Sequence, residues 1–173
     1  MRPGNSIQQK QYNRNSLLQQ VARWRLLGKT HVFTNGCFDL LHAGHIASLT
    51  EAAQYGDVLI VALNSDASVK KLKGPGRPLN SEADRTLIMA SLSMVDAVVV
   101  FPEDTPRELI LAIQPDVLIK GGDYTLDQIA GARDVLSWGG QVFINPIVPG
   151  LSTTGLIQKM QHPVSGARPD NGK

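Results

Sequence analysis

The 173-residue sequence predicts one α/β domain, a three-layer α/β/α sandwich on a five-stranded parallel sheet. Short apolar runs bounded by turn residues alternate with segments whose apolar residues recur at helical spacing. Strands separated by helices need crossover connections, which produce a parallel sheet with helices on both faces. Motifs rich in glycine and polar residues follow several apolar runs, so we expect a Rossmann-like domain with its ligand at the carboxyl edge of the sheet.

Five apolar runs predict the strands. The clearest is residues 57–63, Asp-Val-Leu-Ile-Val-Ala-Leu, because a continuous apolar run with turn signals on both sides is typical of a parallel strand buried on both faces. In chain order, the predicted strands are residues 30–33, 57–63, 97–101, 116–120 and 141–148.

Helical spacing and end signals predict six helices. Apolar residues of 15–27 fall on one stripe, and Asn80 or Ser81 caps a strong helix whose first turn carries acidic residues. Pro106 fits the first turn of a helix, whereas Gly131 weakens another. The predicted helices are residues 15–27, 43–54, 81–94, 105–113 and 126–138, and one that starts near residue 152.

Composition limits the class of protein. The predicted domain covers residues 15–161, and we expect a flexible N-terminus at 1–14 and a disordered tail at 162–173, because both ends are polar. The net charge is +2 with dispersed basic residues, which argues against a nucleic-acid surface and favours small anionic ligands. The single cysteine, Cys37, excludes an intrachain disulfide. No apolar stretch suits a membrane span or a leader, so we expect a cytoplasmic protein with no membrane partner.

Residues Thr34–His45 form the most informative motif, Thr-Asn-Gly-Cys-Phe-Asp-Leu-Leu-His-Ala-Gly-His. His42 and His45 are three residues apart, so both imidazoles face one side of a helix that begins near Gly44. Gly36 and Gly44 carry no side chain, which lets an anionic ligand approach the backbone. Because the N–H groups at a helix N-terminus bind phosphate, we interpret this motif as the centre of a phosphate-handling active site.

Two other interpretations of the histidine pair remain open. The pair with Cys37 supplies side chains that zinc prefers, and a polar pair can also be part of a satisfied core. A zinc site would need further ligands, but the remaining histidines, His31 and His162, fall in a predicted strand and in the tail. We therefore expect no metal bound directly by protein side chains.

Three further motifs and one arginine stand near predicted strand or helix ends. Residues 150–154, Gly-Leu-Ser-Thr-Thr, can cap a helix, bind phosphate, or do both. Residues 70–78 predict a basic, glycine-bearing loop that bends over a ligand, with a solvated loop as the alternative. Residues 120–123, Lys-Gly-Gly-Asp, place an ammonium and a carboxylate near a nucleotide, although Gly-Gly-Asp alone is only a turn. Arg85 is a surface residue unless its helix points at the site.

Together these motifs resemble a known family. Residues 36–45 and 150–154 resemble, in order and separation, the two signatures of the cytidylyltransferase-like nucleotidyltransferases. With Asn64-Ser65-Asp66, Lys73-Gly74, Arg77-Pro78 and Lys120–Tyr124, the chain most resembles the adenylyltransferases of ADP-heptose synthesis, over about residues 15–161. Many relatives are fused to a sugar-kinase domain, whereas this sequence shows only the transferase part. We therefore expect a stand-alone form that works with a separate kinase.

One position departs from the wider family. Cytidylyltransferases often carry an arginine just before their Gly-Ile-Ser-Thr-Thr signature, where this chain has Ile147-Val148-Pro149. The cation for the outer phosphates is then Lys73, Arg77 or Arg85.

The resemblance implies transfer of AMP from ATP, with Mg²⁺, to D-glycero-β-D-manno-heptose 1-phosphate, giving ADP-heptose and pyrophosphate for the lipopolysaccharide inner core. It implies catalytic roles for His42, His45 and Lys73. Asp39 is among the residues implied to bind the nucleotide, but it can alternatively orient the motif from beneath. The implied nucleotide- and phosphate-binding residues are Thr34, Asn35, Gly36, Cys37, Phe38, Asp39, Gly44, Asn64, Arg85, Lys120, Gly121, Gly122, Asp123, Ser152, Thr153 and Thr154.

Other functions on the same fold stay open. They are transfer to glycerol phosphate from CTP, transfer to phosphopantetheine or nicotinamide mononucleotide, and a non-catalytic nucleotide sensor. The expected partners are small molecules and a second copy of the chain, because relatives commonly form symmetric oligomers and the apolar N-terminal helix with Trp24 offers an interface.

Overall fold

The computed structural model describes residues 7–145, which form a six-stranded, fully parallel sheet in the order β1-β4-β3-β2-β5-β6. The strands are β1 (Gln11–Tyr12), β2 (His31–Gly36), β3 (Val58–Asn64), β4 (Ala97–Phe101), β5 (Val117–Gly121) and β6 (Gln141–Asn145). The helices are α1 (Arg14–Leu26), α2 (Ala43–Ala52), α3 (Asp66–Lys73), α4 (Glu82–Ala90), α5 (Arg107–Ile113) and α6 (Ala132–Ser137), with short 3₁₀ turns η1 (Gln8–Lys10), η2 (Ala53–Tyr55) and η3 (Leu126–Gln128).

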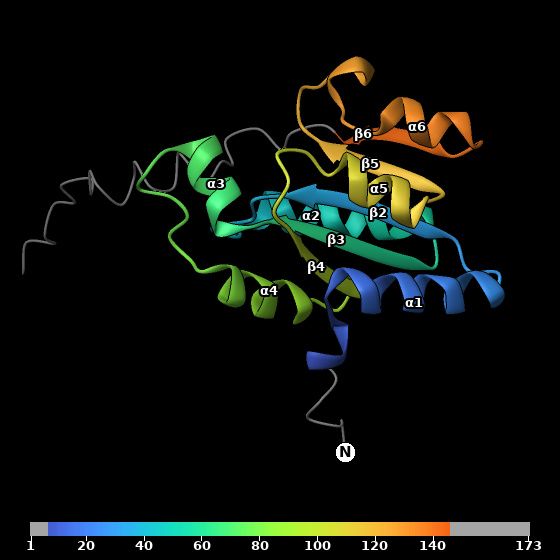
Figure 1. Ribbon diagram of the computed structural model, residues 1–173, viewed down its shortest axis with the longest axis horizontal. Coiled ribbons are helices and arrows are strands. Elements are labelled where there is room, and N and C mark those ends of the chain that lie inside the picture. The colour runs from blue at the N-terminus through green and yellow to red at the C-terminus, as the bar shows by residue number, and fades with distance from the viewer. Residues whose placement is uncertain (1–6, 146–173) are drawn as a thin grey trace, which may run out of the picture.

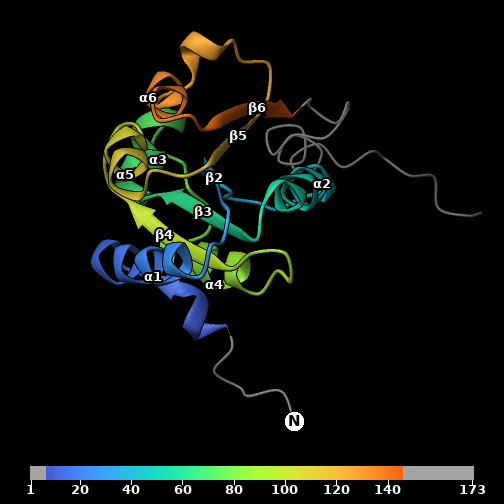
Figure 2. The same ribbon diagram turned by 90° about the vertical axis from the view of Figure 1, so that its right-hand side faces the viewer.

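Helices cover both faces of the sheet, as the sequence predicts. Helices α1, α5 and α6 lie on one face, and α2 and α4 lie on the other (Figure 1 and Figure 2). Apolar residues of α1, α5 and α6 pack around Phe33, Ile60 and Val99, whereas α2 and α4 pack around Val32 and Val61. Neighbouring side chains of a strand point to opposite faces, so each strand contributes to both cores.

Strand β3 is the centre of the domain. All seven of its residues are buried, which confirms the prediction made from its continuous apolar run. It pairs with β2 on one side and β4 on the other, in a register that sets Phe33 beside Ile60 and Leu63 beside Val100. A strand buried on both faces and both edges gives the surrounding loops a rigid base.

Two strands differ from the prediction. The sheet has a sixth strand, β1, inside the segment 1–14 that we expected to be flexible, because Gln11 and Tyr12 pair with Val98 and Val99 at the free edge of β4. Strand β2 continues to Gly36, where a loop was expected, because residues 34–36 keep pairing with residues 61–63. The first residues of the histidine motif are therefore held in the sheet.

Two helical predictions also need correction. Residues 66–73 form α3, which includes residues 70–73 of the predicted basic loop 70–78. Ser65 caps this helix by accepting a hydrogen bond from the Ser68 N–H, and Val69 is buried. The irregular segment before α4 is accordingly shorter than predicted. The predicted helix 126–138 is divided into η3 and α6 by Gly131, whose φ of 84° starts α6 in the left-handed region.

Some predictions fall outside the described residues: the end of the strand 141–148, the motif Gly150–Thr154, the helix from about residue 152 and the tail 162–173. Across residues 7–145, no helix has both the length and the apolar character needed to cross a bilayer.

Candidate active site

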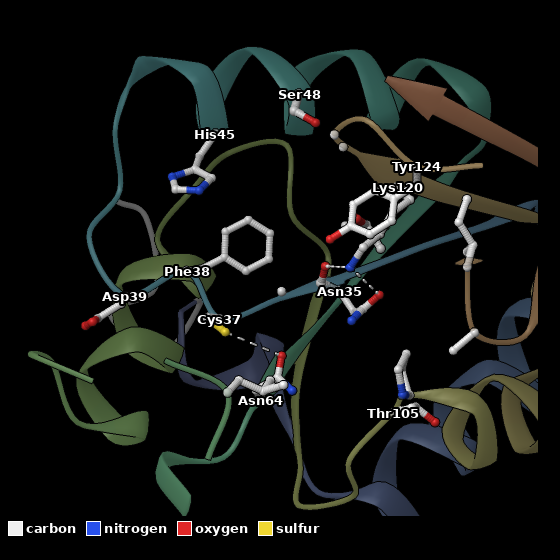
Figure 3. Close-up of a pocket in the computed structure, with 18 of the residues that line it drawn as sticks. Asn35, Cys37, Phe38, Asp39, His45, Ser48, Asn64, Thr105, Lys120 and Tyr124 are labelled. Carbon is white, nitrogen blue, oxygen red and sulfur yellow. Dashed lines mark hydrogen bonds between the residues drawn. The ribbon is translucent and has the colours of Figure 1, made fainter. Parts of the chain in front are cut away.

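The chain changes direction in the sheet between β2 and β5. From β2 it builds outward through β3 and β4, then returns to the other side of β2 with β5 and β6. In open parallel sheets, ligands bind at such a switch point, outside the carboxyl ends of the strands. A cleft of about 960 Å³ lies there, lined by the ends of β2, β3 and β5, the start of α2 and the loop before α5 (Figure 3).

The two histidines meet at the start of α2, as the spacing predicts. His42 is the N-cap of α2 but makes no side-chain capping bond, and its ring stacks on that of His45 with centroids 3.8 Å apart. The Phe38 ring meets His45 edge-on, with centroids 5.2 Å apart. Within residues 7–145, the buried Nδ1 atoms of both histidines have no hydrogen-bond partner. Stacking therefore orients these rings without using their polar atoms.

Burial favours the neutral form of both imidazoles. It lowers the pKa of His42, and together with the nearby His42 it lowers the pKa of His45 to about 4. A neutral imidazole with its proton on Nε2 is a hydrogen-bond donor, so the pair can donate to phosphate oxygens at neutral pH without carrying charge. Among the described residues, no group of three or more His, Cys, Asp or Glu side chains could hold a metal ion.

On the other side of β2, Lys120 of β5 reaches the cleft. Its ammonium donates to the Asn35 carbonyl oxygen at 3.2 Å and to Asn35 Oδ1 at 3.3 Å, and it lies 5.5 Å from the centre of the Tyr124 ring. Burial lowers the pKa of Lys120, and the charge of Lys73 acts in the same direction. A lysine with three N–H donors keeps one for a ligand after these two contacts.

The tip of β2 is surrounded by basic residues. Cys37 follows β2, and its sulfur lies 3.9 Å from Asn64 Oδ1 at the end of β3. Burial raises the pKa of the Cys37 thiol, while the charges of Lys73 and Lys120, among others, act against that rise. Lys73 ends α3 with an exposed side chain that lines the cleft. An anion at the tip of β2 would thus have an ammonium on either side.

Asp39 positions the motif from beneath. Its carboxylate is buried and accepts hydrogen bonds from Arg77 Nε and from the N–H groups of Leu79 and Asn80, while Asn80 Nδ2 donates to the Asp39 carbonyl. Burial alone would raise the pKa of this carboxyl, but these donors lower it below its ordinary value. A carboxylate with so many donors serves to fasten the loop before α4 to the loop after β2.

Arg85 does not occupy the position expected for a phosphate ligand. It is only 1% exposed, lies outside the cleft lining, and donates to the carbonyl oxygens of Cys37, Asn64 and Asn80 and to Asp66 Oδ1. Its fork of donors therefore ties the ends of β2 and β3 to α4 from behind. Sequence analysis placed Arg85 on the correct helix, but only the packing of α4 against β3 and β4 turns it inward.

The cleft brings together most of the predicted site residues. Those that line it are Thr34, Asn35, Gly36, Cys37, Phe38, Asp39, His42, Gly44, His45, Asn64, Lys73, Lys120, Gly121, Gly122 and Asp123. Arg77 also lines it, with its Nε bonded to Asp39. The residues Ser152, Thr153 and Thr154 lie outside the described range.

Several lining residues were missed by sequence analysis. Ser48 lies one turn beyond His45, and a side chain on Gly121 would put its Cβ 3.2 Å from Ser48 Oγ, so this glycine lets α2 approach β5 closely. Thr105 and Gln128 line the opposite side. The helical spacing of His45 and Ser48 was a usable signal, whereas nothing local marked Thr105 or Gln128.

Known proteins resemble this chain in sequence. A family model described as cytidylyltransferase-like matches residues 33–159. The chain is 55% identical over 152 residues to a bifunctional protein HldE from Koribacter versatilis and 54% identical over 148 residues to one from Methylobacillus flagellatus. These matches cover 88% and 86% of this chain but only 31% and 30% of those proteins, so the chain spans about a third of their length.

Solved structures share the fold. A lipopolysaccharide core biosynthesis protein from Thermoplasma volcanium has a TM-score of 0.56 and 27% identity, covering 70% of this chain and 98% of that one. A pantoate-β-alanine ligase from Francisella tularensis also has a TM-score of 0.56, at 15% identity, covering 79% of this chain and 66% of that one. The second likeness concerns the fold alone.

Proposed function

We propose, from the premise that this chain belongs to the cytidylyltransferase-like family, that it transfers AMP from ATP to D-glycero-β-D-manno-heptose 1-phosphate. The products would be ADP-heptose, a precursor of the lipopolysaccharide inner core, and pyrophosphate. Support comes from the site motifs at residues 34–45, 64–66, 73–78 and 120–124, and from the similarity to bifunctional proteins HldE.

One observation carries the proposal: two imidazoles whose neutral form is favoured stack at the start of α2, in a cleft that two lysines also line. Neutral donors and flanking ammonium groups suit a phosphoryl group whose charge increases during reaction. A sensor that only binds nucleotide needs cations and N–H groups but gives no reason for a paired, uncharged donor set. The arrangement therefore favours a transferase.

In the proposed reaction, an oxygen of the sugar phosphate forms a bond to the α-phosphorus of ATP. The bond from this phosphorus to the oxygen bridging to the β-phosphate breaks, and pyrophosphate leaves. The attacking phosphate is already anionic, so the protein need not remove a proton, and its contribution is positioning and charge stabilisation.

Each group in the cleft has a place in this scheme. His42 and His45 would donate hydrogen bonds to the α-phosphate oxygens, where charge builds in the transition state. Lys73 and Lys120 would hold the phosphates on either side of the tip of β2. Asp39 and Arg85 would keep the loops in place without touching substrate. On the family pattern, Ser152, Thr153 and Thr154 would hold the departing pyrophosphate.

Magnesium would enter with the triphosphate. The carboxylates that line the described cleft, Asp39, Asp104 and Asp123, belong to separate loops, and Asp39 is already bonded to Arg77. This donor set fits an ion bound mainly by phosphate oxygens rather than an all-protein cage. When bound, Mg²⁺ would neutralise charge on the departing phosphates.

We also propose that the chain works in the cytoplasm, where ATP is available, and as a homo-oligomer. Trp24 packs against Tyr12 and His31 of its own chain, so only part of the helix face that carries it is available to a second copy. Light scattering that gives the mass of a monomer would contradict the oligomer.

The test is pyrophosphate release in the presence of Mg²⁺, with ATP or CTP and a panel of acceptors that includes heptose 1-phosphate and glycerol 3-phosphate. We expect turnover with ATP and heptose 1-phosphate, an ADP-heptose product by mass spectrometry, and none without acceptor. Activity with CTP and glycerol phosphate alone would overturn the proposed substrates, and ATP binding without any turnover would favour a sensor.

A further inference from the structure

One wall of the cleft has no part in the proposed chemistry. It lies opposite α2 and consists of the loop between β4 and α5, with Asp104, Thr105 and Pro106, and of residues 128–130 at the end of η3. In Figure 3, Thr105 lies across the cleft from His45 and Ser48. Helices α2 and α5 cover opposite faces of the sheet, so these walls come from opposite layers.

The two sides of the cleft differ in charge. The imidazoles lie at the start of α2, Lys120 lies on the floor at β5, and Lys73 lines the cleft from the end of α3. The described lining residues of the loop before α5 and of 128–130 include no cation. Phosphoryl groups would therefore occupy the α2 side. The uncharged organic parts of the ligands would extend toward the opposite wall.

Two organic groups must be placed, a nucleoside and a sugar. Near β5, Tyr124 offers an exposed aromatic ring, a flat apolar surface that suits a base. Near the ends of β3 and β4, the wall offers the Asp104 carboxylate and the Thr105 hydroxyl, and Asn64 and Lys73 also line the cleft. Hydroxyl and carboxylate groups match a polyol, because each sugar hydroxyl both donates and accepts hydrogen bonds.

The polar groups near β4 are available to a ligand. Thr105 is exposed, and its hydroxyl makes no hydrogen bond within residues 7–145. The Asp104 carboxylate is held across the rim by Lys71 of α3, with Nζ at 2.7 Å from Oδ1 and 2.6 Å from Oδ2. An ionised carboxylate has about four acceptor sites, so this ion pair orients Asp104 and leaves acceptor capacity for hydroxyl donors.

We propose that Asp104 and Thr105 bind hydroxyl groups of the acceptor sugar and so determine acceptor specificity. The inference rests on the proposed function, in which the acceptor is a sugar phosphate. Lys71 is a positioning residue that holds the Asp104 carboxylate at the rim. A site that hydrogen-bonds a substrate hydroxyl discriminates against analogues that lack it, because its own polar groups then lose their partner.

The test varies acceptor and ATP separately in the full chain. For Asp104→Asn, we expect KM for the sugar phosphate to rise about 10-fold or more, the scale of one hydrogen bond to a charged group. For Thr105→Val, we expect a rise of about 3- to 10-fold, the scale of one neutral hydrogen bond. In both variants KM for ATP should change less than about twofold, because the nucleoside would bind beside Tyr124.

Controls separate recognition from an effect of the ion pair. Lys71→Gln breaks the same ion pair but keeps the carboxylate, so it should raise the acceptor KM less than Asp104→Asn does. Asp134→Asn, which breaks the ion pair between Arg107 and Asp134, two residues that do not line the cleft, should leave both KM values unchanged. Acceptor analogues that lack single hydroxyls should identify the bound one, because Thr105→Val should no longer discriminate against that analogue.

The outcomes distinguish the inference from the proposed function. If the unaltered chain does not use ATP and the sugar phosphate, the proposed function fails. If it does, but both variants keep the acceptor KM of the unaltered chain, only the inference fails. A rise in KM for ATP alone would show that this wall binds the nucleoside and would overturn the inference, as would equal effects of Lys71→Gln and Asp104→Asn.

Discussion

Acidification from pH 7 to pH 5 should destabilise the folded chain through His45. Its pKa is about 4 in the fold, because of burial and the adjacent His42, against an ordinary value of 6.5 in the unfolded chain. Between these values the unfolded chain binds the proton and the folded chain does not, so stability is fully present above pH 6.5 and is lost as the pH falls toward 4. For this single group, the free energy of unfolding should drop by about 2 kcal/mol from pH 7 to pH 5.

The assay is urea unfolding at both pH values, followed by the fluorescence of Trp24 and Trp138. His31 and His42 act in the same direction, since burial lowers their pKa values too, so the comparison needs a variant. His45→Gln removes only the contribution of His45, and it should therefore lose about 2 kcal/mol less than the unaltered chain on acidification. Equal losses in the two proteins, or an imidazole signal of His45 that titrates near pH 6.5 by NMR, would refute the reasoning.

The same pKa has a consequence for turnover. If His45 donates to phosphate as a neutral imidazole, kcat/KM should not follow an imidazole titration between pH 6 and pH 8, because this ratio reports the ionisation of the free enzyme. A loss of activity centred near pH 6.5 that disappears in His45→Gln would instead show that the charge state of this ring changes in the working range.

Three further predictions concern the site. His42→Ala and His45→Ala should each lower kcat about 100-fold or more with an unchanged circular dichroism spectrum, and near-normal turnover would remove that imidazole from the mechanism. Arg85→Gln should lower the free energy of unfolding in urea by about 3 kcal/mol, because buried carbonyls lose their donors. A variant that is fully stable but binds ATP weakly would instead indicate that Arg85 is a phosphate ligand. Asp39→Asn should cost about 1–3 kcal/mol and lower kcat, since the loop before α4 loses its acceptor; unchanged stability and kcat would contradict its positioning role.

Periodicity and turn residues were sufficient for most of the fold. The run at 57–63 became the central strand β3, and the alternation of strands and helices became a parallel sheet with two helical layers. Strand β1 was missed, because a pair of residues joins a sheet only where a neighbouring edge is free, and no local pattern reports that edge. Helix α3 was missed although Ser65 caps it, since its lysines and the following glycines suggested a loop.

At the candidate active site, the sequence alone determined where the two histidines meet. The spacing of His42 and His45, and their position between a strand and a helix, predicted paired imidazoles at a helix N-terminus, and the structure places them there. Local spacing is enough for this, because both residues belong to one helix start. The tertiary structure decided what surrounds them: Lys120 across β2, Arg85 turned inward, and Asp104 and Thr105 on the opposite wall. These residues come from separate elements, and their distances depend on sheet order and packing, which no short stretch of sequence encodes.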